Sequence, residues 1–168
     1  MVFLDIPRRG RSIRQRHSII RLARDRAPQA YPLVNTLRSG LTLDMWLDYV
    51  DAMNADGGID AGILAAVDTQ GYMHGLFAYR IEPDLADGRV LEVENFIAAD
   101  VCGRDDAGRD LIEVIKRLAD DKRCGAIRVS VVQDVPAMVV NPNPTFGRFS
   151  REGLCADGVQ LRKQVARA

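Results

Sequence analysis

A short glycine-containing loop between a strand-like and a helix-like segment could bind an anion. The loop lies within residues 101–112, after an apolar run that ends at Ala99 and before a helical pattern that begins near Gly108. The first amides of a helix have no intrahelical acceptors, and the helix dipole adds partial positive charge at that end. A strand–loop–helix arrangement of this kind is a ready anion site, and phosphate groups are its usual ligands.

Two aspartates in this loop, Asp105 and Asp106, oppose phosphate binding. Two unit charges about 4 Å apart interact by about 1 kcal/mol in bulk water and by about 4 kcal/mol at an effective dielectric of about 20. Arg104 and Arg109 flank the loop and could offset the repulsion. Alternatively, Asp105 or Asp106 caps the helix and occupies the amides that a phosphate would use. The sequence leaves both roles open.

The other side chains that could do chemistry are few. Of the two histidines, His74 lies in a strand-like run, and His17 lies in an arginine-rich segment without an evident partner. We expect His74 to be structural, because a hairpin histidine more often is. The three cysteines, Cys102, Cys124 and Cys155, are odd in number and widely spaced, which argues against a disulfide framework and a zinc site. We therefore expect no metal ion and a cytoplasmic location.

Composition and charge indicate a soluble protein with one main domain. The chain has 168 residues, 47% hydrophobic and 27% charged, and its 23 Lys and Arg residues balance 23 Asp and Glu. The whole molecule therefore offers nucleic acid no strong field, and no apolar run reaches the roughly 20 residues of a membrane helix. Residues 1–17 form a basic arm, which we expect to be solvated because no aromatic residue alternates with its arginines. Residues 18–168 form the domain.

Hydrophobic periodicity predicts the elements that position these residues. Thr42 is the expected N-cap of a helix that ends before Gly57. The other predicted helices are residues 28–39, 108–123 and 145–152, the predicted strands are residues 18–23, 62–68, 72–81, 90–99, 126–132 and 158–165, and residues 82–88 form a polar loop. The order β-α-α-β-β-β-α-β-α-β contains one β-α-β crossover. It predicts an α/β (α+β) fold with a mixed sheet and helices on its faces.

This order, with a glycine-containing loop after the fourth strand, resembles the GNAT N-acetyltransferase superfamily. The resemblance covers roughly residues 20–165. It includes the hairpin, the strand Leu91-Glu-Val-Glu-Asn-Phe-Ile-Ala98, the helix start Ala107-Gly-Arg-Asp-Leu-Ile112 and the pair Gly153-Leu154. It implies a GNAT-like mixed central sheet of about six to seven strands flanked by helices.

The phosphate-binding loop of that family is only partly kept in this sequence. Its pattern reads Gln or Arg, two residues, Gly, any residue, then Gly or Ala, and its amides hold the pyrophosphate of acetyl-CoA. On residues 103–108, Gly108 keeps the last position, Gly103 replaces the Gln or Arg, and Asp106 replaces the first Gly. The tyrosine that often serves the family as general acid falls on Phe149, which has no proton to donate.

The resemblance implies a set of site residues. The family commonly draws its base from the fourth strand, where Glu92 and Glu94 alternate with Val93 and share one face. Glu94 is the first candidate because it lies nearer the expected thioester, and Glu92 is the second. The alternative is that both carboxylates lie on a solvated face of the sheet. The implied cofactor-binding residues are Phe96, Ala98, Gly103, Arg104, Asp106, Ala107, Gly108 and Arg109.

The activity that the resemblance implies is CoA-dependent N-acyl transfer. The acyl group would move from acetyl-CoA or another acyl-CoA to an amine of a small molecule or a protein. Because Asp106 and Phe149 stand at motif positions, the alternative is a catalytically inactive GNAT-fold module with a binding or regulatory role. We expect no membrane and no nucleic-acid partner, and homodimers are common in the family.

Overall fold

One mixed sheet forms the centre of the structure, a computed structural model that describes residues 16–36, 38, 40–99, 106–130 and 144–155. Within these residues five strands pair in the order β1-β2-β3-β4-β5. They are β1 Ser18–Arg21, β2 Ala61–Val67, β3 Met73–Asp84, β4 Gly88–Ala98 and β5 Ala126–Val129. Neighbouring strands are antiparallel except β4 and β5, which are parallel. The predicted mixed sheet is confirmed with fewer strands than the resemblance implied, and the strand predicted at residues 158–165 lies outside the described residues.

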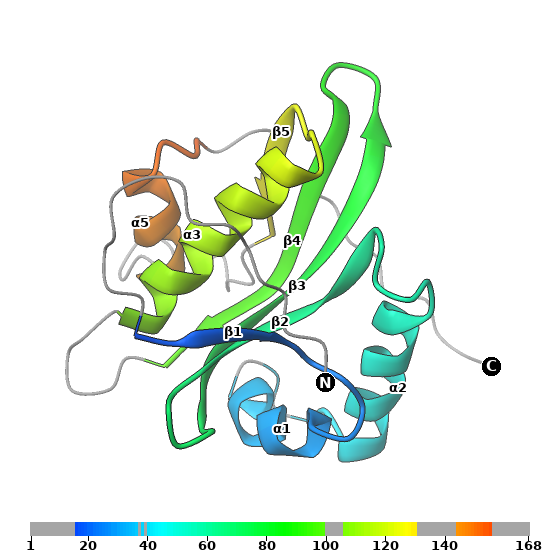
Figure 1. The fold of residues 1–168 in the computed structure, drawn as a ribbon, viewed down its shortest axis with the longest axis vertical. Coiled ribbons are helices and arrows are strands. Elements are labelled where there is room, and N and C mark those ends of the chain that lie inside the picture. The colour runs from blue at the N-terminus through cyan, green and yellow to red at the C-terminus, as the bar shows by residue number, and fades with distance from the viewer. Residues whose placement is uncertain (1–15, 37, 39, 100–105, 131–143, 156–168) are drawn as a thin grey trace.

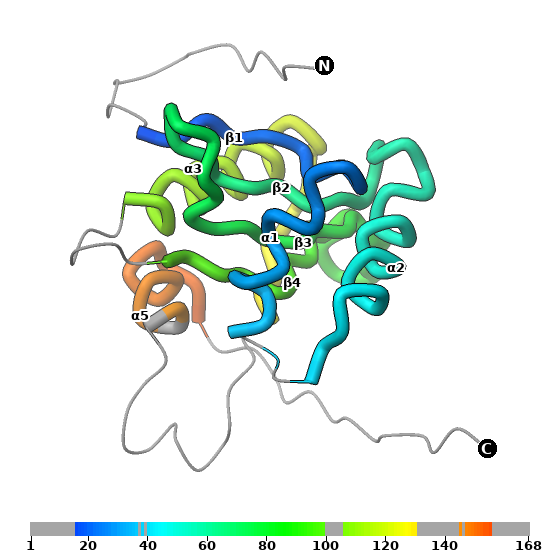
Figure 2. Tube along the Cα trace, turned by 90° about the horizontal axis from the view of Figure 1, so that it is seen from below, coloured from blue at the N-terminus to red at the C-terminus, as the bar shows by residue number. Residues whose placement is uncertain are grey.

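Two pairs of helices cover the two faces of the sheet (Figure 1). The helices are α1 Ala27–Asn35, α2 Leu43–Asn54, α3 Asp106–Asp121 and α5 Pro144–Arg151. α1 and α2 lie on one face, and α3 and α5 lie on the other; Figure 2 separates the two layers. The order of elements matches the predicted order as far as α5. The α/β (α+β) class with helices on both faces of the sheet is therefore confirmed.

Each face of the sheet has its own hydrophobic core, because successive side chains of a strand point to opposite faces. On the α3 face, Leu111 and Ile115 are at most 1% exposed and pack against apolar side chains of β2, β3 and β4. On the α1–α2 face, Trp46 and Met53 pack over Ile63 of β2. Burying one such side chain stabilises the fold by about 1.5–3 kcal/mol. The two cores fix the helices that carry the polar side chains discussed below.

Local sequence signals explain how α2 is placed. The Thr42 side chain accepts a hydrogen bond from the Met45 amide at 3.2 Å, which confirms the predicted N-cap. Buried Trp46 donates from Nε1 to the Ala27 carbonyl at 2.8 Å and so ties α2 to the start of α1. Trp46 and Met53 are core residues, as the helical spacing predicts, whereas Tyr49 between them is only half-buried.

The loop predicted at residues 82–88 is instead the tip of a long hairpin of β3 and β4. Pro83 pairs with Arg89, beyond Arg80, which is the last β3 residue that pairs with β2. A proline without an amide is tolerated there because, among the described residues, no strand pairs with the other edge of β3 at Pro83. The Asp84 carboxylate accepts the amides of residues 86 and 87 and closes the turn. These turn contacts therefore extend the hairpin through residues whose polar composition had indicated a loop.

Candidate active site

A bulge near the end of β4 changes the direction of its side chains. Ala78 of β3 pairs with Glu94, and Leu76 pairs with Ile97, so β4 has one more residue than β3 between these pairs. Asn95 occupies the bulge with a φ of 50°, in the left-handed region that asparagine tolerates better than most residues. The bulge allows two successive side chains, those of Glu94 and Asn95, to act on the same helix.

That helix is α2, which contributes Tyr49. Asn95 Nδ2 donates a hydrogen bond to the Tyr49 hydroxyl at 3.1 Å. Burial raises the pKa of the Tyr49 phenol and the negative charge of Glu94 raises it further, while the Asn95 hydrogen bond and the positive charge of Arg80 act in the opposite direction. The Tyr49 hydroxyl therefore keeps its proton at neutral pH. We refer to Tyr49, Glu94 and Asn95 together as the β4 site.

The second candidate base, Glu92, lies on the same strand face but has a different environment. Its carboxylate forms an ion pair with Arg128 of β5. Arg128 also contacts the Asp84 carboxylate at 3.2 Å. The hydrogen bonds that Arg128 donates to these two carboxylates, with Glu92 the larger influence, raise the pKa of its guanidinium. Glu92 is therefore held in a surface ion-pair network, whereas no described cation contacts Glu94 in this way, and Glu94 is the better-placed base.

β4 and β5 pair over only the first part of β4. Their register runs from Val90 with Ala126 to Val93 with Val129, and the Ser130 amide donates to the Val93 carbonyl at 2.8 Å. Beyond Val93, no residue in the described ranges pairs with the β5-facing edge of β4. The backbone of residues 94–98, which includes the predicted positions Phe96 and Ala98, therefore has hydrogen-bonding groups that a ligand could use.

Phe149, at the position of the family's tyrosine, is a core residue. It is 4% exposed and packs edge-to-face on Phe96, with ring centroids 4.9 Å apart. The pair joins α5 to β4 on the α3 face of the sheet. Phe149 therefore contributes packing rather than proton transfer, and the side chain of Phe96 belongs to the core.

The start of α3 carries the aspartate that replaces a glycine of the family's loop. Asp106 is the first residue of the helix, and its carboxylate lies 3.2 Å from Arg16 and 3.8 Å from Arg109. Arg109 thus partly offsets the charge, as predicted, and Arg16 adds a second cation that the sequence did not indicate. Ala107 and Gly108 are buried in the first turn. The predicted positions Gly103 and Arg104, together with Asp105, lie outside the described residues.

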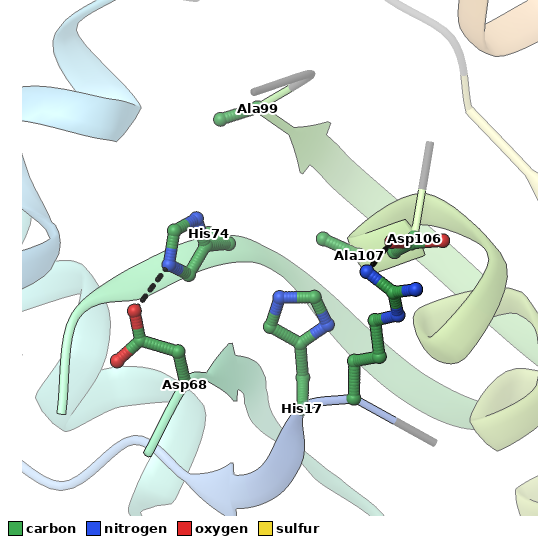
Figure 3. A pocket seen from close by; sticks show the side chains of 7 residues that line it. His17, Asp68, His74, Ala99, Asp106 and Ala107 are labelled. Carbon is green, nitrogen blue, oxygen red and sulfur yellow. Dashed lines mark hydrogen bonds and ion pairs between the residues drawn. The ribbon is translucent and has the colours of Figure 1, made fainter. Parts of the chain in front are cut away.

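Beside the first turn of α3, two histidines each pair with an aspartate. His17 Nδ1 lies 2.9 Å from Asp110 Oδ2, and His74 Nε2 lies 2.8 Å from Asp68 Oδ2. The centroids of the two imidazole rings are 5.1 Å apart, and the ring planes are tilted by 53° to each other. Figure 3 shows the two side chains as neighbours. The hydrogen bond to His74 is also the main cause that lowers the pKa of the Asp68 carboxyl. His74 therefore has a structural partner, as expected, and His17 has one that the sequence did not reveal.

These residues line a pocket of about 260 Å³ at the end of the sheet where α3 begins (Figure 3). The lining residues are Arg16, His17, Asp68, His74, Ala99, Asp106 and Ala107. They come from the segment before β1, the β2–β3 hairpin, the end of β4 and the first turn of α3. The sequence analysis did not predict that these four segments lie together.

The residue that sequence reasoning missed is Asp110, although a signal for it exists. Asp110 is 7% exposed. Its position falls at helical spacing among Ala107, Leu111 and Val114, so it is a carboxylate on the apolar stripe of α3. A carboxylate on a buried face needs partners, which here come from His17 and the backbone before β1.

Among the described residues, no group of three or more His, Cys, Asp or Glu side chains could hold a metal ion. No helix in the described ranges is long and apolar enough to cross a membrane. Cys124 and Cys155 are free thiols.

Comparisons with known proteins bear on the fold. No protein-family model matches the sequence, and no curated protein matches it. Among solved structures, a glucosamine-6-phosphate N-acetyltransferase from Arabidopsis thaliana matches with a TM-score of 0.66 at 13% identity, over 89% of this chain and 99% of that chain. A ribosomal-protein-alanine N-acetyltransferase from Brucella melitensis biovar Abortus 2308 matches with a TM-score of 0.66 at 16% identity, over 89% and 99%.

A third match is a structure that contains CoA. An aminoglycoside N-acetyltransferase in complex with CoA gives a TM-score of 0.66 at 14% identity, over 97% of this chain and 99% of that chain. At these identities the likeness is one of fold. The chain therefore has the fold of the GNAT N-acetyltransferases, as the resemblance of its sequence implied.

Proposed function

We propose that this protein is an N-acyltransferase that moves an acyl group from an acyl-CoA, such as acetyl-CoA, to an amine of a small molecule or a protein. The observation that carries the proposal is the β4 site. There Asn95 of the bulge bonds to the Tyr49 hydroxyl, and the charge of Glu94 raises the Tyr49 pKa, beside a stretch of β4 that has no described strand partner beyond Val93. A proton acceptor thus lies next to backbone groups that a thioester ligand could use.

The described residues fit an acyl-CoA in two respects. Residues 94–98 of β4 offer an unpaired edge within the described part of the chain, which suits the amide groups of a pantetheine arm. At the start of α3, Asp106 would repel a phosphate, but Arg16 and Arg109 neutralise it. The fit depends on these two arginines, because the family's glycine pattern is incomplete.

The chemistry assigned to the β4 site follows from its side chains. An acyl-CoA would supply an activated thioester. The amine nitrogen bonds to the acyl carbon, the carbon–sulfur bond breaks with its electron pair leaving on the CoA thiolate, and the amine proton is lost. The thiolate takes up a proton from water and leaves as free CoA. Glu94 accepts that proton, directly or through water. Tyr49 keeps its own proton, so its hydroxyl can donate a hydrogen bond to the acceptor or to a water. Asn95 fixes the position of that hydroxyl.

The test compares two glutamates on one face of one strand. Glu94→Gln removes the proposed base, whereas Glu92→Gln removes a carboxylate that is paired with Arg128. We expect Glu94→Gln to lower the rate of acyl transfer about 100- to 10,000-fold, as removal of a general base commonly does. We expect Glu92→Gln to change it little. The readout is thiol release from acetyl-CoA over a panel of primary amines, together with acetyl-CoA affinity, which both variants should retain.

A specific observation favours a second candidate function. Phe149 is buried against Phe96 at the position of the family's tyrosine acid, so α5 supplies no acid there. In that reading the chain is a catalytically inactive GNAT-fold module that binds a ligand without transferring a group. Acetyl-CoA binding with no acyl transfer to any amine in the panel would favour this reading. Equal rates for the native protein and Glu94→Gln would remove Glu94 as the base.

We also propose the cytoplasm as the compartment. The free thiols Cys124 and Cys155 suit a reducing environment.

A further inference from the structure

Two arginines close to the β4 site have no part in the proposed chemistry. Arg80 is a residue of β3, and Arg38 lies in the connection between α1 and α2. Both are exposed to solvent. Within the described part of the chain, neither guanidinium forms an ion pair. Both cations are therefore open to a ligand of the site.

Strand pairing places Arg80 near Glu94. The register of β3 and β4 pairs Ala78 with Glu94, and Arg80 follows Ala78 by two residues, on the same face of the sheet. Arg80 and Glu94 are therefore diagonal neighbours, which lie about 7–8 Å apart in antiparallel pairs. The Arg80 guanidinium contacts helix α2, with Nη2 3.3 Å from Met53 Sδ. Met53 is about one helical turn from Tyr49, so Arg80 reaches the helix that supplies the phenol of the β4 site.

This contact leaves Arg80 without a counter-ion among the described residues. A thioether sulfur is a weak acceptor and carries no charge. The carboxylate opposite Arg80 on β4 belongs to Glu92, which is already paired with Arg128. A guanidinium has five N–H donors in a fork that matches a carboxylate or a phosphate. Arg80 therefore keeps most of its donors for an anion that enters from solvent.

The pKa of Tyr49 shows that the charges of both arginines act on the β4 site. Burial raises this pKa most and Glu94 raises it next, whereas the Asn95 hydrogen bond lowers it. The positive charges of Arg80 and, to a smaller extent, of Arg38 lower the same pKa. One carboxylate and two guanidiniums therefore act on one phenol. An acceptor that brings its amine to the carboxylate and an anion to the guanidiniums would match these charges.

We propose that the acceptor is a small amine that also carries an anionic group, a carboxylate or a phosphate, and that Arg80 binds this group while Glu94 receives the amine. The proposal rests on the proposed function and names the substrate class of the β4 site. Arg38 adds a second positive charge. The group transfer is unchanged: the amine nitrogen replaces the CoA sulfur at the acyl carbon, Glu94 takes the amine proton, and water protonates the thiolate. Arg80 takes no part in these bonds and determines which amine is bound.

The test measures acceptor preference with matched amines in the native protein and in Arg80→Ala, Arg80→Lys and Arg24→Ala. The amines are γ-aminobutyrate, aminoethyl phosphate and aminobutanol, which has the chain length of γ-aminobutyrate but no anion. Thiol release from acetyl-CoA gives kcat and KM for each amine. Arg24 is the control, because it is an exposed arginine whose charge is already paired with Asp51 of α2.

We expect the native protein to have a higher kcat/KM for an anionic amine than for aminobutanol. Arg80→Ala should lower this ratio about 10- to 100-fold, the range for a lost hydrogen bond to a charged group, mainly through a higher KM for the anionic amine. Arg80→Lys should restore part of the ratio, because it keeps the charge and loses the fork. Arg24→Ala should keep the native ratio. The two anionic amines distinguish a carboxylate from a phosphate.

Two outcomes would overturn the assignment of Arg80 while the proposed function stands. One is a native protein that acetylates aminobutanol as well as the anionic amines. The other is an Arg80→Ala variant in which transfer to all three amines falls alike, as a structural role would cause. If the native protein acetylates no amine, anionic or neutral, the proposed function falls and this assignment falls with it. Urea unfolding of each variant controls for folding, and we expect Arg80→Ala to remain folded because it removes no ion pair among the described residues.

Discussion

At the scale of single residues, the pKa of Tyr49 depends on the charge of Glu94. Burial and the Glu94 charge raise the Tyr49 pKa, so the folded state holds the phenol proton more tightly than the unfolded chain does. The resulting contribution to stability is present below the unfolded pKa of about 10 and is lost as the pH rises above it. We expect alkaline absorbance titration to place Tyr49 above ordinary tyrosines, and Glu94→Gln to lower its pKa. Tyr49→Phe identifies the signal, and a Tyr49 titration unchanged by Glu94→Gln would contradict the β4 site.

Asp110, beside the pocket, is the aspartate whose removal should cost more stability than that of an exposed aspartate. Asp110→Ala leaves the amides of Arg16 and His17 without their acceptor in a largely buried place. We expect the free energy of unfolding to fall by about 1–3 kcal/mol, the cost of an unsatisfied buried group. Asp51→Ala, which removes a half-exposed carboxylate, should change it by about 0.5 kcal/mol or less. Urea unfolding measures both, and equal losses would contradict the role of Asp110 as the buried acceptor of these two amides.

At the scale of elements, the close approach of α3 to β3 depends on Gly75. A Cβ at this position would lie 2.7 Å from the Ile97 carbonyl oxygen and 2.8 Å from Leu111 of α3. We expect Gly75→Ala to lower the free energy of unfolding by about 1–3 kcal/mol, because the backbone of β4 cannot yield easily and the Leu111 side chain would have to move within the core. Gly147 of α5 has open space around its Cβ position. Gly147→Ala should therefore stabilise the protein by about 0.5–1 kcal/mol, and a loss as large as that of Gly75→Ala would contradict the packing argument.

Some of these elements could be predicted from the sequence, and others could not. Helix α2 follows from the Thr42 cap and the spacing of Trp46 and Met53, and the structure confirms both. The loop predicted at residues 82–88 was wrong, because part of it is the tip of the β3–β4 hairpin. Pro83 and the polar turn residues are typical of a loop when the pairing of the strands is unknown. The bulge at Asn95 was not predicted either. It depends on pairing with β3, and a single strand contains no signal of its partner's register.

Part of the candidate site could likewise be predicted from the sequence, and part could not. The alternation of Glu92 and Glu94 with Val93 predicted that both carboxylates lie on one face of the strand. In the structure their environments differ, because Glu92 forms an ion pair with Arg128 and Glu94 does not. The helix was predicted to begin near Gly108, whereas α3 begins at Asp106. Arg109, which the sequence placed beside the loop as a possible offsetting charge, contacts Asp106. The contribution of Arg16 could not be read from the sequence, because it lies far from Asp106 along the chain and the contact exists only in the folded sheet.

At the scale of the whole molecule, the last two residues of the predicted basic arm, Arg16 and His17, pack against the domain. Arg16 and His17 are bonded to α3 in the structure. We expect removal of residues 1–15 to leave the melting temperature and acetyl-CoA affinity close to those of the full chain. Removal of residues 1–17 should lower both, because Asp110 loses its partners and the pocket loses Arg16. Thermal unfolding and calorimetry check this, and equal behaviour of the two truncations would contradict it. Neither truncation should change nucleic-acid binding, for which we expect none.

The measurement that tests the central claim most directly is a calorimetric titration of the full-length native protein with acetyl-CoA. The claim is that a GNAT fold with an aspartate at the first turn of α3 still binds an acyl-CoA, because Arg16 and Arg109 neutralise that aspartate. The account predicts saturable binding in the micromolar range, with one site per chain and weaker binding at higher salt. A folded protein that gives no binding heat and shows no rise in melting temperature with millimolar acetyl-CoA would contradict it.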